Sequence, residues 1–259
     1  MRVHALEYHD VMESGQESGF PGRAADSYKL SVTDFEAHLL ALADITSEAR
    51  CSALDLAGPV PAPPVLLTFD DGGCSALTTI APRLERAGWR GHFFVTTGRL
   101  GQPGFLTEAG VRELRSRGHW IGSHSESHPL RMAALTDAEL RREWSHSVGR
   151  LSDLLGSPVT LASVPGGGFS RRVASTAAAA GIRVLFTSEP EVGVKHHAGV
   201  RVIGRFTLRR GDGSIRAARF ARGAALARWR EWTWWNGKKL AKAIGGPAYL
   251  GLRRALMGE

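Results

Sequence analysis

The 259-residue sequence predicts an α/β fold with a mostly parallel sheet. Short apolar runs alternate with segments of helical periodicity, as in chains where a crossover helix follows each strand. Seven such runs favour a barrel or near-barrel over an open sheet, although the pattern separates the two poorly, and a chain of this length can form a barrel as one unit. The candidate strands are Val3–Tyr8, Val65–Phe69, His92–Thr97, Trp120–Ser123, Thr160–Val164, Val184–Thr187 and Arg201–Phe206.

Two helices between these strands carry clear boundary signals. Thr136 and Glu139 form a Thr-x-x-Glu capping box, and Gly156 is a stop signal. A second helix is expected to begin near Ser170, to run through an alanine-rich stretch and to end at Gly181. Apolar residues recur at near-helical spacing within the first helix: Leu140, Trp144, Val148, Leu151 and Leu155.

Two stretches fall outside the repeating pattern. Glu13–Ala25 is rich in glycine and serine and is predicted to be a loop over the barrel mouth or surface. Residues 216–259 are predicted to form a basic helical extension packed on a barrel of residues 1–215. In the extension, tryptophans next to basic side chains suit a membrane interface or a saccharide platform, whereas packing on the barrel is the alternative. These tryptophans are Trp229, Trp232, Trp234 and Trp235.

Composition points to a folded protein in a reducing compartment. The hydrophobic content of 43% and charged content of 22% are ordinary for a soluble domain. Cys51 and Cys74 are too few for a disulfide framework. The first ten residues contain no apolar run, so neither a secretory signal nor a membrane anchor is expected there. A cytoplasmic location is the resulting prediction.

The net charge of +8 is concentrated after Gly199. A basic end of this kind could meet nucleic acid, anionic lipid or an acidic saccharide carrier, or it could be a solvated surface. A nucleic-acid role would rest on charge alone, so no nucleic-acid partner is expected.

Two adjacent carboxylates follow the second predicted strand. Leu66–Gly72 reads LLTFDDG, with Asp70 and Asp71 at the strand end. Such neighbours repel each other unless a cation, a shared proton or water offsets the repulsion. Because side chains alternate along a strand, one carboxylate could ligate a metal while the other faces substrate. A solvated Asp-Asp-Gly turn is the alternative.

Two histidines follow another predicted strand. Trp120–Pro129 reads WIGSHSESHP, and its spacing can bring His124 and His128 onto one face of a turn. A surface pair is the alternative for these two residues alone. Two imidazoles and one carboxylate are a common catalytic ligand set for zinc and similar ions. Both clusters follow strands, where barrels carry their chemistry, so together they predict one metal site.

These motifs together resemble the polysaccharide deacetylases of the NodB-homology type, the fourth family of carbohydrate esterases. The resemblance rests on TFDDG at 68–72, HFFVTTG at 92–98 and GHWIGSHSESHP at 118–129, and it covers about residues 65–190. It implies a distorted (β/α)7-type barrel, here with a C-terminal helical extension, and removal of acetyl groups from N-acetylated sugars. By position, Asp70 would be the general base, and Asp71, His124 and His128 would bind one divalent metal ion.

The implied chemistry is hydrolysis of an amide. A divalent ion would lower the pKa of water and polarise the amide carbonyl, and Asp70 would take the proton as the water attacks. Zinc is favoured for this ligand set, although cobalt, nickel or manganese could fill it. Pro165, Gly166 and Gly167 are expected to let the backbone approach the substrate closely.

Two positions depart from the family pattern. Ser163 stands where the family has an arginine that orients the base, and Arg171 or Arg172 could supply that cation or could simply be exposed. Arg205 stands where the family has a histidine that protonates the leaving amine. Arginine stays protonated and cannot be a general acid, but Arg205 could stabilise an oxyanion or bind an anionic substrate group.

Other residues could take the place of the missing acid. His196 and His197 lie just upstream of Arg205, and Glu189 follows the sixth predicted strand. His9, after the first strand, could line the pocket or be a structural histidine.

The sequence therefore predicts a metal-dependent hydrolase that removes N-acetyl or other acyl groups from amino sugars of a poly- or oligosaccharide. Lipid linkage of this glycan, with contact of the extension to the inner face of the membrane, is a further hypothesis. Two alternatives remain: hydrolysis of another non-peptide linear C–N bond, or carbohydrate binding with a retained metal site and no turnover. The departures at Ser163 and Arg205 favour binding alone, and the intact carboxylate and histidine pairs argue against it.

Overall fold

The computed structural model describes residues 1–13, 15–45, 52–56 and 63–237. Its main sheet contains β1 (His4–Tyr8), β4 (Val65–Phe69), β5 (His92–Val95), β6 (Trp120–Ser123), β7 (Leu161–Ser163), β8 (Val184–Phe186), β9 (Lys195–His197), β10 (Val200–Ile203) and β11 (Phe206–Thr207). A separate pair contains β2 (Val11–Met12) and β3 (Leu30–Ser31). The α-helices are α1 (Arg23–Asp26), α2 (Val32–Ala41), α3 (Ala81–Arg86), α4 (Glu108–Ser116), α5 (Asp137–Leu155), α6 (Arg171–Ala179) and α7 (Ser214–Ala221).

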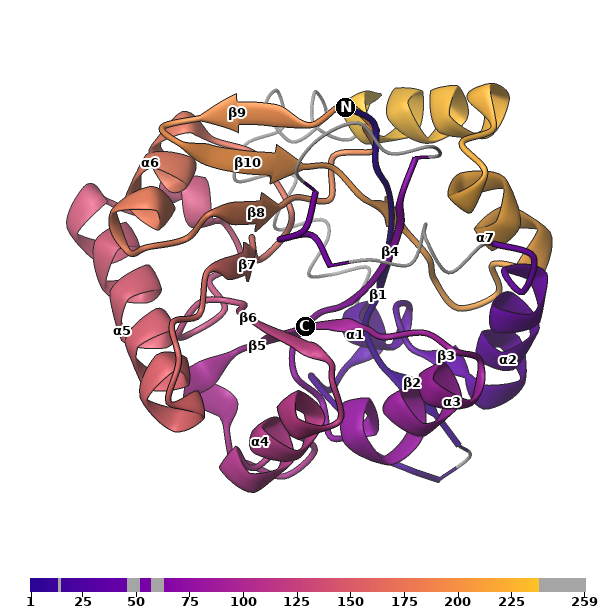
Figure 1. The fold of residues 1–259 in the computed structure, drawn as a ribbon, viewed down its shortest axis with the longest axis horizontal. Coiled ribbons are helices and arrows are strands. Elements are labelled where there is room, and N and C mark those ends of the chain that lie inside the picture. Colours follow the sequence, from indigo (N-terminus) through magenta and orange to yellow (C-terminus); the bar gives the residue numbers. More distant parts are fainter. Residues whose placement is uncertain (14, 46–51, 57–62, 238–259) are drawn as a thin grey trace.

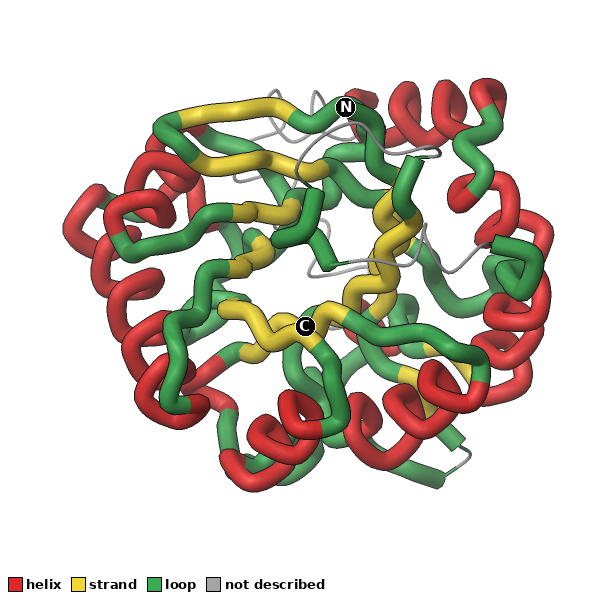
Figure 2. The backbone as a smooth tube through the Cα atoms, in the orientation of Figure 1, coloured by secondary structure: helices red, strands yellow, loops and turns green. Residues whose placement is uncertain are grey.

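The main sheet curls into a half-barrel with helices around its outside (Figure 1). Its strand order is β11-β1-β4-β5-β6-β7-β8-β10-β9. Every neighbouring pair is parallel except β9 with β10. Figure 2 shows the helices as an outer ring around the strands. The predicted distorted α/β barrel is confirmed.

The boundary signals of α5 act as the sequence predicts. The Thr136 side chain accepts a hydrogen bond from the Glu139 backbone N–H, and the Glu139 carboxylate accepts one from the N–H of Thr136. Gly156 ends the helix in the left-handed conformation, with φ 61°. Residue Ser170 is the N-cap position of α6.

The prediction of one strand over Arg201–Phe206 is wrong, because two strands share this stretch. β10 pairs with β8, whereas β11 pairs with β1, and the break falls at Gly204 and Arg205. A Cβ atom on Gly204 would lie 2.3 Å from the Glu189 carbonyl oxygen, so only glycine fits where the chain crosses over. β9 was not among the predicted strands, because its Lys-His-His sequence has no apolar alternation.

Strand alternation explains both the core and the position of the polar residues. One buried cluster joins inward-facing residues of several strands: Ala5, Leu66, Phe94, Leu161, Val184, Phe186 and Ile203. Their neighbours, such as Leu67 and Phe93, belong to the cluster beneath the helices. Two residues further along the same inward register come Glu7, Thr68, Ser163 and Arg205, all buried. The carboxyl ends of the strands therefore gather polar side chains inside the half-barrel.

The C-terminal part begins within a helix of the barrel wall. α7 spans the predicted boundary between residues 215 and 216 and packs on α2 and β1, with Ala217, Phe220 and Ala221 buried. Residues 225–237 are also helical. Residues 238–259, with the lysines at 238, 239 and 242, lie outside the described residues, as does Cys51. Within the described part of the chain, no helix is both long and apolar enough to cross a membrane.

The capping box of α5 gives a first prediction. Thr136→Ala leaves the Glu139 backbone N–H at the helix start without its acceptor, so we expect a loss of about 0.5–2 kcal/mol in the free energy of unfolding, measured in urea. The matched control is Ser145→Ala, on an exposed face of the same helix, which should change the free energy by less than about 0.5 kcal/mol. Equal losses in both variants would contradict a capping effect.

Candidate active site

Three side chains bring ligand atoms to one point at the carboxyl ends of β4 and β6. Asp71 Oδ1 lies 3.4 Å from His124 Nε2 and 3.3 Å from His128 Nε2. Although Asp71 Oδ1 is buried, it accepts no well-aligned hydrogen bond from any described residue. A buried carboxylate oxygen without a donor is costly, and a cation would remove that cost. The donor set therefore fits a divalent metal ion.

The backbone is bent to make this convergence. Asp71 and His128 have φ angles of 74° and 58°, in the left-handed region, which costs about 1–2 kcal/mol for a non-glycine residue. Both carboxylates lie at this site, since His124 Nε2 is 3.4 Å from Asp71 Oδ1 and 3.9 Å from Asp70 Oδ2.

The protonation of Asp71 suits a metal ligand. Burial raises the pKa of this carboxyl, but the two histidines beside it lower the pKa well below its usual range. Asp71 is therefore anionic at neutral pH even without an ion in the site.

Ser163 links His124 to Asp70. The Ser163 carbonyl oxygen lies 3.1 Å from His124 Nδ1 and accepts a hydrogen bond from the N–H at that position. This tautomer leaves Nε2 with the lone pair that a metal needs. The Ser163 hydroxyl lies 2.5 Å from the same Nδ1 and donates to Asp70 Oδ1 at 3.1 Å. The residue that replaces the expected arginine thus contacts both the predicted base and a predicted ligand.

Arg205 supplies the cation that the sequence lacks at position 163. Its guanidinium is fully buried and donates to both oxygens of Asp70 at 2.7 Å. The other donations go to Thr68, Thr187 and Glu7, at 3.1–3.2 Å. All five N–H donors are therefore taken, and contact with a substrate oxyanion or anion would require breaking one of these bonds.

Arg171 and Arg172 do not reach Asp70. Both are exposed on α6, and Arg172 pairs with Asp137 at 2.8 Å.

The ion pair between Arg205 and Asp70 also sets the charge of Asp70. Burial raises the pKa of the Asp70 carboxyl, but the charge of the adjacent Arg205 guanidinium outweighs burial and lowers the pKa to about 2. Asp70 is therefore anionic at neutral pH, in the state that a general base requires.

His9 lies beside this pair. Ligand atoms of Glu7, His9 and Asp70 lie within 4.8 Å of one another. The oxygens of Glu7 are taken by hydroxyl groups and by Arg205, whereas His9 Nδ1 is buried without a hydrogen-bond partner. The His9 ring packs against Tyr28, with centroids 4.7 Å apart.

Two of the other candidate acids belong to a strand away from Asp70. His196 and His197 belong to β9, at the far edge of the sheet from β4, and His197 Nε2 is 3.1 Å from Ser175 Oγ on α6. The backbone carbonyl of Glu189 accepts a hydrogen bond from the N–H of Arg205.

The loop after β7 needs its glycines for packing. Gly166 and Gly167 have φ angles of 67° and 69°. A Cβ atom on Gly167 would lie 2.0 Å from Ser188 Oγ, and one on Gly166 would lie 3.0 Å from the Leu130 carbonyl oxygen. Their close approach is therefore to neighbouring loops of the protein, and it does not test the predicted substrate contact of Pro165 and these glycines.

Phe20 is a neighbour of the site that the sequence analysis missed. Its ring lies 4.6 Å from the His128 ring and 5.1 Å from the Phe105 ring, and the Arg99 guanidinium lies 5.3 Å from it. Asp10 anchors its loop by accepting hydrogen bonds from Ser18 and Ser75. Only the glycine- and serine-rich composition marked this segment, and α1 ends the predicted loop at Arg23.

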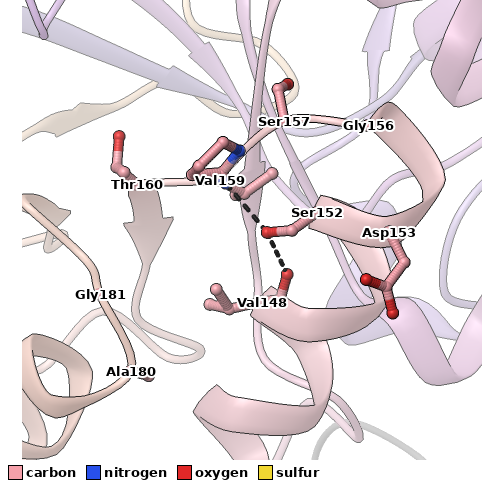
Figure 3. A pocket seen from close by; sticks show the side chains of 10 residues that line it. Val148, Ser152, Asp153, Gly156, Ser157, Val159, Thr160, Ala180 and Gly181 are labelled. Atoms are coloured by element: carbon pink, nitrogen blue, oxygen red, sulfur yellow. Dashed lines mark hydrogen bonds between the residues drawn. The ribbon is translucent and has the colours of Figure 1, made fainter.

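A separate hollow of about 570 Å³ lies away from these residues (Figure 3). It is bounded by the end of α5, the residues before β7 and Gly181, and so lies toward the amino end of β7. Ser152 bridges its wall, accepting from the Val159 N–H and donating to the Val148 carbonyl. It contains none of the predicted site residues.

The buried ion pairs of Arg205 with Asp70 and Glu7 give a second prediction, for the metal-free protein. Arg205→Met should cost about 3–5 kcal/mol at pH 7, because it leaves Asp70 and Glu7 buried without their cation. Without Arg205, burial raises the pKa of Asp70, so protonation relieves the variant as the pH falls. In the parent, the Arg205–Asp70 pair contributes fully to the free energy of unfolding above about pH 4, and this contribution is lost as the pH falls toward about 2. The deficit should therefore be smaller at pH 4.5 than at pH 7.

Urea unfolding at both pH values measures this difference. Arg172→Met, which breaks an exposed pair, is the control and should cost less than about 1 kcal/mol at either pH. An Arg205→Met deficit that does not change with pH would contradict the electrostatic account.

Comparisons with known proteins agree with this architecture. The family model described as polysaccharide deacetylase matches residues 57–185. YxkH of Bacillus subtilis (strain 168), named as a polysaccharide deacetylase, is 26% identical over 197 residues, which are 73% of this chain. This chain spans only 65% of the length of that relative.

Two solved structures share the fold. The Streptococcus pyogenes deacetylase PplD, in complex with acetate, matches with a TM-score of 0.70 and 19% identity, over 85% of this chain and 98% of its own. IcaB from Ammonifex degensii matches with a TM-score of 0.66 and 20% identity, over 85% of this chain and 97% of its own. The family match assigns residues 57–185 to the polysaccharide deacetylase family of NodB homology, and this stretch contains the motifs at positions 68–72 and 118–129.

Proposed function

We propose that this protein is a divalent-metal-dependent hydrolase that removes N-acetyl groups from the amino sugars of a poly- or oligosaccharide. The observation that carries the proposal is the buried, unpartnered Asp71 Oδ1 between two imidazole nitrogens, with the anionic Asp70 beside it. The family that residues 57–185 match supports the substrate class.

Asp71, His124 and His128 would hold the ion, and zinc is favoured for two imidazoles and one carboxylate. When bound, the ion would supply Lewis-acid activation of water and of the amide carbonyl. The Ser163 carbonyl keeps the proton of His124 on Nδ1, so that Nε2 stays available to the ion.

Asp70 would take the proton from the attacking water. Arg205 fixes the plane of this carboxylate through two 2.7 Å hydrogen bonds, so the oxygen that accepts the proton is held in one orientation. The same contact stabilises the anionic form of Asp70 and so weakens it as a base. Precise orientation would offset part of that loss.

His9 would return a proton to the leaving amine. Its Nδ1 is buried without a hydrogen-bond partner among the described residues, and a ring nitrogen of His9 lies within 4.8 Å of the ligand atoms of Glu7 and Asp70. An imidazole can carry a proton at neutral pH, whereas Arg205 cannot release one.

Two other functions remain candidates. The changed acid could serve a different leaving group on another linear, non-peptide C–N bond, or the protein could bind a glycan without turnover. The compensation between Ser163 and Arg205 favours turnover, because an oriented, anionic base has no evident use in a protein that only binds.

The third prediction measures metal content and acetate release together. The parent should bind one divalent ion per chain and release acetate from N-acetylated sugar oligomers. Asp70→Asn should keep the ion and lose activity by roughly 10²–10⁴-fold, since it removes the base and keeps the shape of the side chain. Metal binding without cleavage of any substrate would favour the alternatives, and a chain that binds no ion would rule out the metal site.

We also propose that the C-terminal helix contacts an anionic membrane surface, such as the inner face of a membrane that carries a lipid-linked glycan. Trp229, Trp232 and Trp234 are exposed by 61%, 46% and 57%. Glu231, in the same helix, is buried and pairs with Arg216. Tryptophans beside arginines suit the headgroup region of anionic lipids.

Vesicle flotation of the full chain tests this contact and is the fourth prediction. The parent should float with vesicles of phosphatidylcholine and phosphatidylserine, less with phosphatidylcholine alone, and less as salt rises. Replacement of Trp229, Trp232 and Trp234 by serine should remove most of the flotation. The control replaces two exposed leucines on other elements, Leu40 and Leu130, and should float like the parent. Equal flotation of all three proteins would refute the contact.

A further inference from the structure

Glu143 is a buried carboxylate that the proposed reaction does not use. It lies on α5, is only 3% exposed and contacts the loop between the two histidine ligands. Its Oε2 accepts hydrogen bonds from the backbone N–H groups of Glu126 and Ser127, each at 2.9 Å, and its Oε1 accepts one from the Ser127 hydroxyl at 2.6 Å. Three donors in one loop thus satisfy a group that would be costly to bury alone.

The opposite side of the loop is held by the chain after β5. The carbonyl oxygen of Ser125 accepts a hydrogen bond from the Thr97 N–H, and that of Glu126 accepts one from the Gly98 N–H at 2.8 Å. A Cβ atom on Gly98 would lie 2.6 Å from the Glu126 carbonyl oxygen, so this approach requires glycine. The loop is therefore held by its N–H groups on one side and by its carbonyl groups on the other.

This fixation matters because the loop is strained. Ser125 and His128 have φ angles of 63° and 58°, which an unconstrained chain avoids. Consecutive N–H groups that point the same way form a concave anion site, and here the anion is the protein's own Glu143. One turn later on α5, Ser147 lies 2.6 Å from the hydroxyl of Ser123, at the start of the same loop.

We infer that Glu143 is a positioning residue for the proposed metal centre. It holds the loop so that His124 and His128 point at Asp71 before any ion binds. Ligands already in place lose little freedom on binding, so Glu143 sets metal affinity as well as local stability. This inference rests on the proposed metal site, and its test separates the two.

The test titrates the metal-free full chain with Zn²⁺ in competition with a chromophoric chelator. Glu143→Leu leaves three loop donors without an acceptor, and we expect roughly 10- to 100-fold weaker binding. Glu143→Gln can still accept both backbone hydrogen bonds through its amide oxygen and should restore affinity to within about threefold of the parent. Val148→Ala, on the same helix and buried away from the loop, should lower the thermal midpoint and leave the affinity unchanged.

Each outcome decides the inference. Weak binding in Glu143→Leu, with rescue in Glu143→Gln and normal affinity in Val148→Ala, supports it. A loss below about threefold in a folded Glu143→Leu, or an equal loss in Val148→Ala, overturns it. If Glu143→Leu does not fold, Ser127→Ala decides: weakening above about twofold supports the inference and a smaller change overturns it. A parent that binds no Zn²⁺ overturns the metal site itself, and the inference with it.

Discussion

Arg205 lies where the chain leaves β10 and enters β11, and its guanidinium reaches Asp70 at the end of β4. The same group donates to Glu7 on β1 and to the Thr187 carbonyl after β8. Among the described residues no hydrogen-bonded ladder joins β10 to β11, so this side chain helps to hold the two sides of the half-barrel together, along with backbone contacts such as the Val3 N–H to the Val192 carbonyl. A buried arginine that makes five hydrogen bonds to four residues is stable only while those residues remain in place. The shape of the barrel and the charge of the site therefore depend on one set of contacts.

The site holds more negative charge than its arginine can neutralise. Glu7, Asp70 and Asp71 are all buried near one another, and Arg205 pairs with only the first two. Asp71 is left to the histidines, whose nitrogens approach without forming aligned hydrogen bonds. An added cation would balance this charge, whereas a second buried arginine would fill the space that water and substrate need.

Much of this arrangement could be predicted from local patterns. The strands Val65–Phe69 and Trp120–Ser123 have the predicted bounds, because apolar runs before polar turns define buried strands well. The capping box placed the start of α5 for a similar reason. The family resemblance is confirmed, while the roles assigned to individual site residues stay proposals.

The features that were not predicted depend on contacts between distant parts of the chain, which a local sequence pattern does not contain. The strand pattern before Asp71 gave no sign of its left-handed backbone, with φ 74°. Ser163 and Arg205 looked like two separate departures from the family pattern. In the folded chain both contact Asp70, and Arg205 places a guanidinium beside Asp70 although position 163 has no arginine. The role of Glu143 could not be predicted from the sequence, since a glutamate in a helix is usually solvated. Its carboxylate oxygens accept hydrogen bonds from the loop only after α5 packs against that loop.

The strand order has a consequence for how the site is assembled during synthesis. β1 lies between β4 and β11, and Leu6 pairs with Phe206, near the other end of the described chain. While the chain emerges from the ribosome, β4 to β8 can pair in sequence, but one edge of β1 stays unpaired until β11 appears. Arg205 arrives at the same late stage, so Asp70 and Glu7 wait for their cation until most of the domain has been made. Such long-range pairing slows folding, and the open edge of β1 is the surface that a chaperone would protect in the interval.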